Sequence, residues 1–323
     1  MKWLIRLGFA ALALVIAVIA SPLVVGRLLG LDGYEVSRPL KGTQIAIGEG
    51  RSLNVFDEGS GQAVILIHGL PGGAAQMGPL ADRLVALGYR TVRYDRLGFG
   101  RSSARGGQPY TLEQNARELT ALMDSLDIPQ AVLVGYSFGG GVVQEMARLA
   151  PERMRAAALV STIGPLRPPR AAQSAGAQAV RGALLYWGLS TKVTAEMFAA
   201  GSFVTLFSPE PISAPDMDAM LATLAKGDSV NTWLREGNAV SEDARLLQPE
   251  SIRAPTLVIH GEADAIVPVA VAKQVAQVID DARLETVADV GHALPMTHAN
   301  EVAAAIDAFL RALACEEMAG SCR

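Results

Sequence analysis

Residues 131–139 read Ala-Val-Leu-Val-Gly-Tyr-Ser-Phe-Gly, and this stretch decides the fold that we expect. The apolar run at its start, up to Val134, predicts a strand buried on both faces. Gly135 and Gly139 flank Ser137 and keep bulk away from it, and the residues that follow have helical character. The pattern predicts a sharp turn between strand and helix, from which the serine oxygen projects at the carboxyl end of a sheet, above a helix N-terminus.

Segments typical of strands and helices alternate on both sides of this stretch. Apolar or alternating runs predict strands at residues 43–47, 52–57, 63–67, 91–95, 131–134, 157–161, 256–259 and 284–287. Helical spacing predicts helices at residues 76–87, 111–126, 139–149, 269–278 and 300–314. Thr111 and Gln114 have the spacing of a helix N-cap and its partner. The alternation predicts an α/β fold with a mostly parallel central sheet flanked by helices on both faces.

The alternation stops between residues 164 and 250. This segment has no clear buried strand, and prolines interrupt it. Its aromatic and methionine residues have helical spacing and include Tyr186, Trp187, Met197, Phe203, Phe207, Met217, Met220 and Trp233. We therefore expect a helical cap at residues 164–250, inserted into a core made of residues 32–163 and 251–315, with a C-terminal tail at 316–323.

Residues 1–31 form a separate segment. No charged residue lies between Arg6 and Arg27, and Lys2 and Arg6 make the preceding flank basic. About 20 apolar residues in a helix span the ~30 Å hydrocarbon core of a bilayer. We expect either an uncleaved transmembrane anchor, with the catalytic domain outside the cytoplasm, or a signal peptide cleaved after Ala20, which would give a secreted or periplasmic protein. The apolar run that continues to Leu29 favours the anchor.

Composition narrows the function classes. Hydrophobic residues make up 50% of the 323 residues and charged residues 19%, which excludes a disordered chain. The net charge of −4 is spread along the chain without a basic block, so we expect no nucleic-acid partner.

Cys315 and Cys322 either pair in an oxidising compartment or stay unpaired, and the sequence leaves both open. No Cys/His metal spacing is present, so we expect neither a metal nor a cofactor.

Cleavage of an ester needs a nucleophile, a base, an acid that orients the base, and donors for the oxyanion. Only four histidines are available as the base for Ser137. His68 and His260 each close a strand and precede glycine, which favours a structural or site-lining role. His298 begins the last helix and is expected at the surface. His292 lies in the loop after the last strand, where an open sheet carries its catalytic loops, and is the predicted base.

Asp264 is the predicted acid. It lies three residues beyond the end of the strand at 256–259 and its glycine, in the sequence His-Gly-Glu-Ala-Asp. The order Ser137, Asp264, His292 is the order typical of a nucleophile on such a turn. Glu262 lies on the same loop and Asp289 is close to His292, so both are alternatives for the acid role.

Backbone N–H groups are the expected oxyanion donors, because fixed dipoles aimed at the developing charge are most effective. The N–H of Phe138 follows the nucleophile directly. The second donor is expected in the loop after the strand at 63–67, which reads His-Gly-Leu-Pro-Gly-Gly. Pro71 has no N–H, so Leu70 is the predicted donor.

Five segments together resemble the α/β-hydrolase superfamily. They are residues 68–72, 94–102, 135–139, 260–264 and 291–292, and they occur in order between Thr43 and Leu313. The resemblance implies an α/β-hydrolase fold and the Ser-Asp-His triad, and it implies a structural role for Asp95. Relatives with epoxide hydrolase or haloalkane dehalogenase activity carry aspartate where this chain has Ser137, which argues against both activities.

The expected function is that of a serine hydrolase that cleaves an ester, thioester or amide bond through an acyl-enzyme. Its partner would be a small-molecule substrate, and the apolar residues of the cap favour an apolar acyl or alcohol group. A C–C bond hydrolase, a cofactor-free peroxidase and a transacylase would use the same triad and stay open as alternatives. A non-catalytic binding protein on this fold is the alternative from another class.

Overall fold

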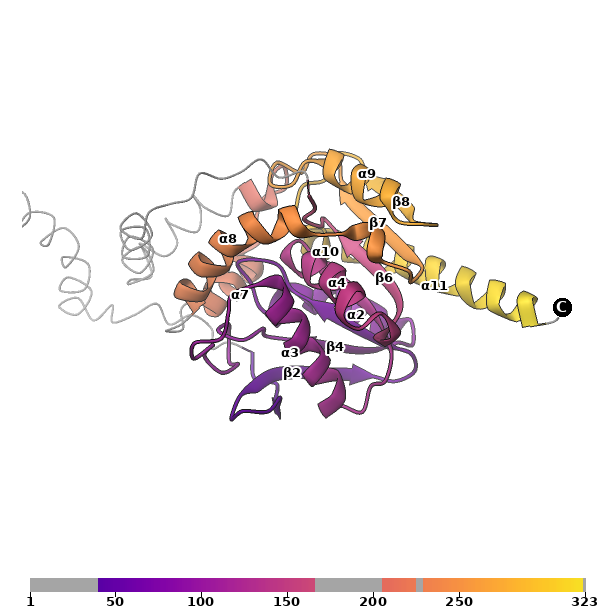
Figure 1. The fold of residues 1–323 in the computed structure, drawn as a ribbon. Helices are drawn as coiled ribbons and strands as arrows, with labels where there is room; N and C mark the ends of the chain where they lie inside the picture. The colour runs from indigo at the N-terminus through magenta and orange to yellow at the C-terminus, as the bar shows by residue number, and fades with distance from the viewer. Residues whose placement is uncertain (1–39, 166–204, 225–228, 322–323) are drawn as a thin grey trace, which may run out of the picture.

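A mixed eight-stranded sheet forms the centre of the protein (Figure 1). The computed structural model describes residues 40–165, 205–224 and 229–321. In spatial order the strands are β1 (Thr43–Ala46), β2 (Ser52–Gly59), β4 (Arg90–Tyr94), β3 (Ala63–Ile67), β5 (Ala131–Tyr136), β6 (Met154–Val160), β7 (Thr256–Gly261) and β8 (Arg283–Val287). Only the β1–β2 and β2–β4 pairs are antiparallel, which confirms the mostly parallel sheet.

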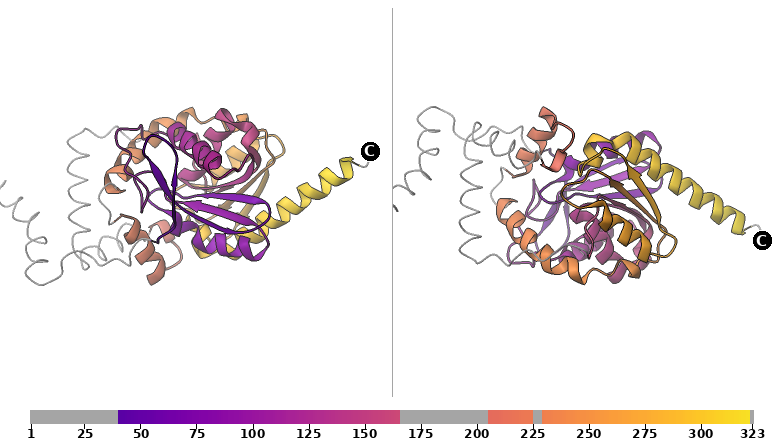
Figure 2. Two further views of the ribbon diagram at one scale, coloured as in Figure 1. Left: turned by 90° about the horizontal axis from the view of Figure 1, so that it is seen from below. Right: turned by 90° about the horizontal axis from the view of Figure 1, so that it is seen from above.

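Helices cover both faces of the sheet (Figure 2). On one face, α3 (Leu112–Ser125), α4 (Phe138–Leu149) and α9 (Val269–Val278) pack on a core that includes Leu133 of β5. On the other face, α2 (Gly78–Ala86), α10 (Leu294–Thr297) and α11 (Ala299–Ser321) pack on a core that includes Val134. Because β5 is buried on both faces, consecutive apolar residues of this strand serve two separate cores.

The first predicted helix and the last one differ from the structure. Residues 74–77 form a 3₁₀ turn, η1 (Ala74–Met77), and α2 begins only at Gly78, because Pro79 fits the first turn of a new helix. The last helix was expected to end near residue 314, but α11 continues to Ser321 and projects beyond the sheet (Figures 1 and 2). The predicted tail is therefore helical up to Ser321, since no proline and no glycine before Gly320 interrupts it.

Other boundaries shift by a few residues. Strand β5 extends to Tyr136 and α4 begins at Phe138, so Ser137 is the only residue between them. The predicted N-cap is present, since Thr111 Oγ1 accepts a hydrogen bond of 3.2 Å from Gln114 N at the start of α3. Two further 3₁₀ turns, η2 (Pro151–Arg153) and η3 (Pro249–Ser251), each begin at a proline.

Two helices represent the predicted cap in the described part of the chain. They are α7 (Ala214–Leu224) and α8 (Ser229–Leu246), which lie together at one end of the sheet (Figure 1). Phe207 and Met220 are buried there, and Met217 and Trp233 pack against them. Residues 166–204 of the predicted cap lie outside the described residues.

The predicted anchor or signal segment at residues 1–31 and the second cysteine, Cys322, also lie outside the described residues. Cys315 is exposed and forms no disulfide with any residue that the structure describes. Among the helices that the structure describes, none has the length and apolar character that a membrane span requires.

Candidate active site

Ser137 occupies the strained turn that the sequence predicts. It connects β5 to α4 with φ 52° and ψ −111°, in the region that non-glycine residues rarely adopt. Backbone bonds hold this conformation, since Ser137 N–H donates to Val160 O at 2.9 Å and Gly140 N–H donates to Ser137 O at 3.0 Å. A Cβ atom at Gly139 would collide with the carbonyl oxygen of Ile67, so the glycine lets helix and strand approach.

His292 lies in the loop between β8 and α10 and is buried. Its Nε2 is 2.9 Å from Ser137 Oγ. Val290 O accepts a hydrogen bond of 2.9 Å from Ala263 N–H, which ties the His292 loop to the loop after β7. The structure therefore brings together two side chains that are 155 positions apart in the chain.

Asp264 follows β7 and completes a hydrogen-bonded chain. Its Oδ2 is 2.6 Å from His292 Nδ1, and its Oδ1 accepts N–H groups of Ile266 and Val267, each at 2.8 Å. Burial alone would raise the pKa of Asp264, but hydrogen bonds from His260 and His292 outweigh burial, so this pKa lies well below its usual range. Asp264 is therefore ionised at neutral pH.

The other two candidate acids lie elsewhere. Glu262 is exposed, and its Oε1 accepts a hydrogen bond of 2.8 Å from Thr286 Oγ1. Asp289 is exposed as well. Among the three carboxylates that the sequence proposes, Asp264 is the one in hydrogen-bond contact with His292.

The ionised carboxylate determines the tautomer of His292. A carboxylate only accepts hydrogen bonds, so Nδ1 of His292 carries the proton that Asp264 accepts. In the neutral ring Nε2 is then unprotonated and faces the hydroxyl of Ser137. This arrangement can take the proton of Ser137 when its oxygen becomes a nucleophile.

Both ring nitrogens of His68 form hydrogen bonds with backbone groups. Its Nε2 accepts the N–H of Arg96 at 3.0 Å, so its Nδ1 carries the proton and donates to Gly69 O at 2.8 Å. Burial and the charge of Arg96 hold the pKa of His68 well below its usual value. His68 is a neutral structural residue, in accordance with the sequence-based expectation.

The two remaining histidines, His260 and His298, have different surroundings. His260 is buried at the end of β7, where its Nε2 donates to Val267 O at 2.8 Å and lies 3.1 Å from Asp264 Oδ2. His298 precedes α11 and is half-buried, with Nδ1 at 3.3 Å from Glu210 Oε1. The contact between His260 and Asp264 was not predicted. The sequence signal that could have indicated it is a histidine at the end of the strand that precedes the acid, four positions before Asp264.

Of the two predicted oxyanion residues, Phe138 directly follows the serine and Leu70 follows a glycine that approaches it. Phe138 is the first residue of α4, where backbone N–H groups have no partner within the helix. A Cβ atom at Gly69 would lie 3.3 Å from Ser137 Cβ, which places the loop that carries Leu70 against the serine. Asp95 lies behind this loop, where its carboxylate accepts N–H groups of Ala74 at 2.8 Å and Arg101 at 3.0 Å.

A buried charge network next to this loop was not predicted. Arg96, Arg105 and Glu118 come from the core, and Glu236 comes from α8. Glu236 lies in a helix of the predicted cap, and sequence spacing alone gives no sign of which core residue it meets. In the described part of the chain, no group of three or more His, Cys, Asp or Glu side chains is arranged to hold a metal ion.

A family model for the alpha/beta hydrolase fold matches residues 62–299. The chain belongs to the α/β-hydrolase family. This α/β-hydrolase is 31% identical over 261 residues to a Synechocystis sp. protein named for non-heme chloroperoxidase activity, which covers 76% of this chain and 90% of that protein. It is 28% identical over 277 residues to 2-hydroxymuconate semialdehyde hydrolase of Pseudomonas putida, covering 82% of this chain and 92% of that enzyme.

A solved structure supports the same fold. An esterase from Exiguobacterium antarcticum superposes on this α/β-hydrolase with a TM-score of 0.69 at 21% identity, covering 84% of this chain and 99% of the esterase. At this level of identity the likeness concerns the fold. Together with the hydrolase relatives, the family identifies the chain as an enzyme.

Proposed function

We propose that this α/β-hydrolase is a serine hydrolase that cleaves an ester, thioester or amide bond through Ser137, His292 and Asp264. The observation that carries the proposal is the unbroken hydrogen-bonded chain from Ser137 Oγ to His292, 2.9 Å, and from His292 to Asp264, 2.6 Å. Such a chain activates a hydroxyl that is a poor nucleophile at neutral pH.

The reaction proceeds in two halves. Ser137 Oγ attacks the carbonyl carbon while its proton moves to Nε2 of His292, and Asp264 stabilises the resulting imidazolium. The tetrahedral intermediate collapses, the leaving group takes the proton from His292, and an acyl group stays on Ser137. Water then gives a proton to His292 as its oxygen attacks the acyl carbon. The second tetrahedral intermediate collapses to release the acid, and His292 returns the proton to Oγ of Ser137.

Leu70 and Phe138 N–H groups stabilise the negative oxygen of each tetrahedral intermediate. Support comes from two positions: Phe138 directly follows Ser137 at the start of α4, and Leu70 follows Gly69, whose backbone approaches Ser137. The N-terminus of α4 adds the favourable end of the helix dipole. Fixed donors of this kind need no rearrangement as the charge develops.

The proposed substrate is a small molecule with an apolar acyl or alcohol group. Ala293, which follows His292, belongs to a buried apolar cluster with Leu206, Phe207, Met220 and Leu221 from the predicted cap. Ile266, two residues after Asp264, packs against the same cluster. Apolar surface beside the reactive groups favours an apolar substrate portion, because its transfer from water is favourable.

A second activity on the same triad is C–C bond cleavage or peroxide-dependent chemistry. Relatives named for a semialdehyde hydrolase and for non-heme chloroperoxidase activity support this alternative. A transacylase would differ only in the acceptor that reaches the acyl-enzyme.

The test uses a fluorophosphonate probe and p-nitrophenyl esters of increasing acyl length on the purified full chain. We expect the probe to label Ser137, and we expect Ser137→Ala to lose labelling and on the order of 10⁶ in turnover. Unchanged labelling or turnover in the variant would exclude the proposed nucleophile. Ester turnover that stays negligible while a dienone or hydrogen peroxide is consumed would favour the second activity.

We further propose that residues 1–31 anchor the enzyme to a membrane with the catalytic domain outside the cytoplasm. The support is the uncharged stretch between Arg6 and Arg27 with its basic flank. Intact-mass measurement of the membrane fraction separates an anchor from a signal peptide, since loss of the first 20 residues would mean cleavage and a secreted or periplasmic enzyme.

A further inference from the structure

The peptide unit between Gly69 and Leu70 links the proposed oxyanion hole to a buried arginine. This peptide is trans, so the Gly69 carbonyl and the Leu70 N–H point in opposite directions. The carbonyl accepts two hydrogen bonds, from His68 Nδ1 at 2.8 Å and from Arg96 Nη2 at 3.1 Å. Any pair of donors that fixes this carbonyl also fixes the direction of the Leu70 N–H.

Arg96 contacts the second oxyanion residue as well. Its guanidinium lies over the ring of Phe138 with 4.2 Å between Cζ and the ring centroid. Phe138 begins α4, so the position of its side chain is coupled to the first N–H groups of that helix. One buried side chain thus contacts the peptide unit that carries the Leu70 N–H and the side chain of Phe138, the two donor residues of the proposed mechanism.

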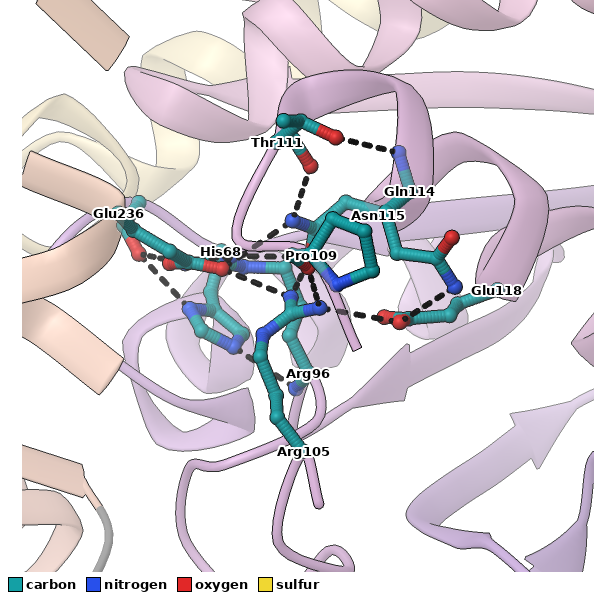
Figure 3. A network of polar contacts seen from close by, with 10 residues as sticks. His68, Arg96, Arg105, Pro109, Thr111, Gln114, Asn115, Glu118 and Glu236 are labelled. Carbon is teal, nitrogen blue, oxygen red and sulfur yellow. Dashed lines mark hydrogen bonds and ion pairs between the residues drawn. The ribbon is translucent and has the colours of Figure 1, made fainter. Parts of the chain in front are cut away.

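The charge of Arg96 is balanced from the cap side. Arg96 Nη1 donates to Glu236 Oε1 at 2.7 Å and Oε2 at 2.8 Å, and both side chains are buried (Figure 3). Glu236 belongs to α8, 140 positions further along the chain. A buried guanidinium without a counter-charge would be strongly unfavourable, so Glu236 stabilises Arg96 where it meets Gly69.

The surrounding residues complete the network. Arg105 Nη2 donates to Glu236 Oε1 at 2.8 Å and Arg105 Nη1 donates to Glu118 Oε1 at 3.0 Å (Figure 3). Asn115 Oδ1 accepts from Arg96 at 3.1 Å and from Arg105 at 2.8 Å. Two arginines and two glutamates therefore cancel in charge, and the network connects α3, the loop after β4 and α8.

We propose that Arg96 is a positioning residue that aims the Leu70 N–H at the oxyanion, and that Glu236 of α8 holds Arg96 in this place. The inference rests on the proposed serine hydrolase function. It gives the predicted cap a role beyond covering the substrate, because α8 would help to fix the direction of the Leu70 N–H in the core. Lysine could not replace Arg96, since an ammonium lacks the planar fork that reaches Glu236, Asn115 and Gly69 together.

The test compares Arg96→Lys and Glu236→Gln with a matched control, Arg105→Lys. The control disturbs the same network through an arginine that donates to Pro109 O, Glu118, Asn115 and Glu236. For each variant kcat and KM for a p-nitrophenyl ester are measured, with the inhibition constant of phenylboronic acid. The boronate forms a tetrahedral adduct on Ser137 and places an oxygen in the oxyanion hole, whereas KM reports ground-state binding. Thermal unfolding is measured in parallel.

We expect Arg96→Lys to lower kcat about 10- to 100-fold and to weaken boronate inhibition in parallel, with KM nearly unchanged. The reason is that misalignment of an oxyanion donor costs part of the rate that complete removal of a donor costs. Glu236→Gln should shift both quantities in the same direction by a smaller factor. Arg105→Lys should lower the unfolding temperature and leave both within about threefold of the parent enzyme.

Three results would overturn the inference. The first is unchanged kcat and boronate affinity in folded Arg96→Lys, and the second is a rise in KM alone. The third is an equal loss in Arg105→Lys, which would mean general damage to the fold. If Arg96→Lys does not fold, unchanged kinetics in the nearly isosteric Glu236→Gln overturns the inference. Failure of the proposed function is distinguishable, because the parent enzyme would then not be labelled by the fluorophosphonate.

Discussion

Asp264, in the loop that follows β7, contacts His260 at the end of that strand, with 3.1 Å between Oδ2 and Nε2. The same Nε2 donates to Val267 O, and Val267 N–H donates to Asp264 Oδ1. The loop thus closes around the carboxylate and directs Oδ2 toward Nδ1 of His292. Because these hydrogen bonds favour the ionised form, they compensate for the burial of Asp264.

We predict that His260→Phe lowers the free energy of unfolding by about 1–3 kcal/mol, because Val267 O and Asp264 Oδ2 lose a buried donor. Urea unfolding of the two proteins measures the difference. His298→Phe is the control, since the half-buried contact of His298 with Glu210 should contribute about 0–1 kcal/mol. Equal losses in the two variants would contradict a special role for the His260 contact.

Asp264→Asn should lower kcat about 10³- to 10⁴-fold, because an amide at this position no longer favours the tautomer of His292 with Nδ1 protonated. Steady-state hydrolysis of the best p-nitrophenyl ester gives the value. Glu262→Gln and Asp289→Asn change exposed carboxylates and are expected to stay within about threefold of the parent enzyme. Near-normal turnover in Asp264→Asn would move the acid role to one of these two residues.

The neutral, buried His68 makes stability depend on pH. Its pKa is lowered in the folded state, so below about pH 6.5 the unfolded chain binds a proton that the native chain does not. The free energy of unfolding should therefore fall as the pH is lowered from 6.5, by about 1.4 kcal/mol per pH unit for this group. Asp264 is ionised in both states in this window, because its pKa is lowered from an ordinary value near 3.8.

Urea unfolding at pH 7.5, 6.0 and 5.0 checks this dependence, with His68→Asn for comparison. Between pH 6.0 and 5.0, the free energy of unfolding should fall less steeply with decreasing pH in the variant than in the parent protein. The difference should correspond to the binding of one proton. Identical slopes in the two proteins would show that His68 takes up a proton in the native state.

Gly139→Ala should destabilise the protein by about 1–3 kcal/mol and lower turnover, because its Cβ would collide with Ile67 O behind Ser137. Gly237→Ala is the matched control within α8. Its Cβ would meet no atom of the described residues within 4 Å, so a gain of up to about 1 kcal/mol is expected from the higher helix propensity of alanine. Thermal unfolding and ester turnover of both variants test the contrast. A Gly139→Ala enzyme with parental stability would mean that the backbone at Ile67 yields easily.

Local patterns predicted most of the fold. The apolar run before Ser137 indicated a doubly buried strand, and β5 is buried along its whole length. Boundaries at prolines and at the C-terminus were less accurate, because a helix end depends on small differences in capping and propensity. The projection of α11 beyond the sheet is one example, since the sequence there contains good helix formers without a stop signal.

For the candidate site, the sequence by itself determined which residue types could act together and in what order: a serine on a constrained turn, one histidine after the last strand and three possible carboxylates. Only the tertiary structure decided that Asp264 meets His292 and that Glu236 of α8 meets Arg96. Turn geometry depends on neighbouring residues, so the local sequence encodes it. Contacts over 28 to 140 positions depend on how strands are ordered and how α8 packs beside the loop after β4, which no local pattern encodes.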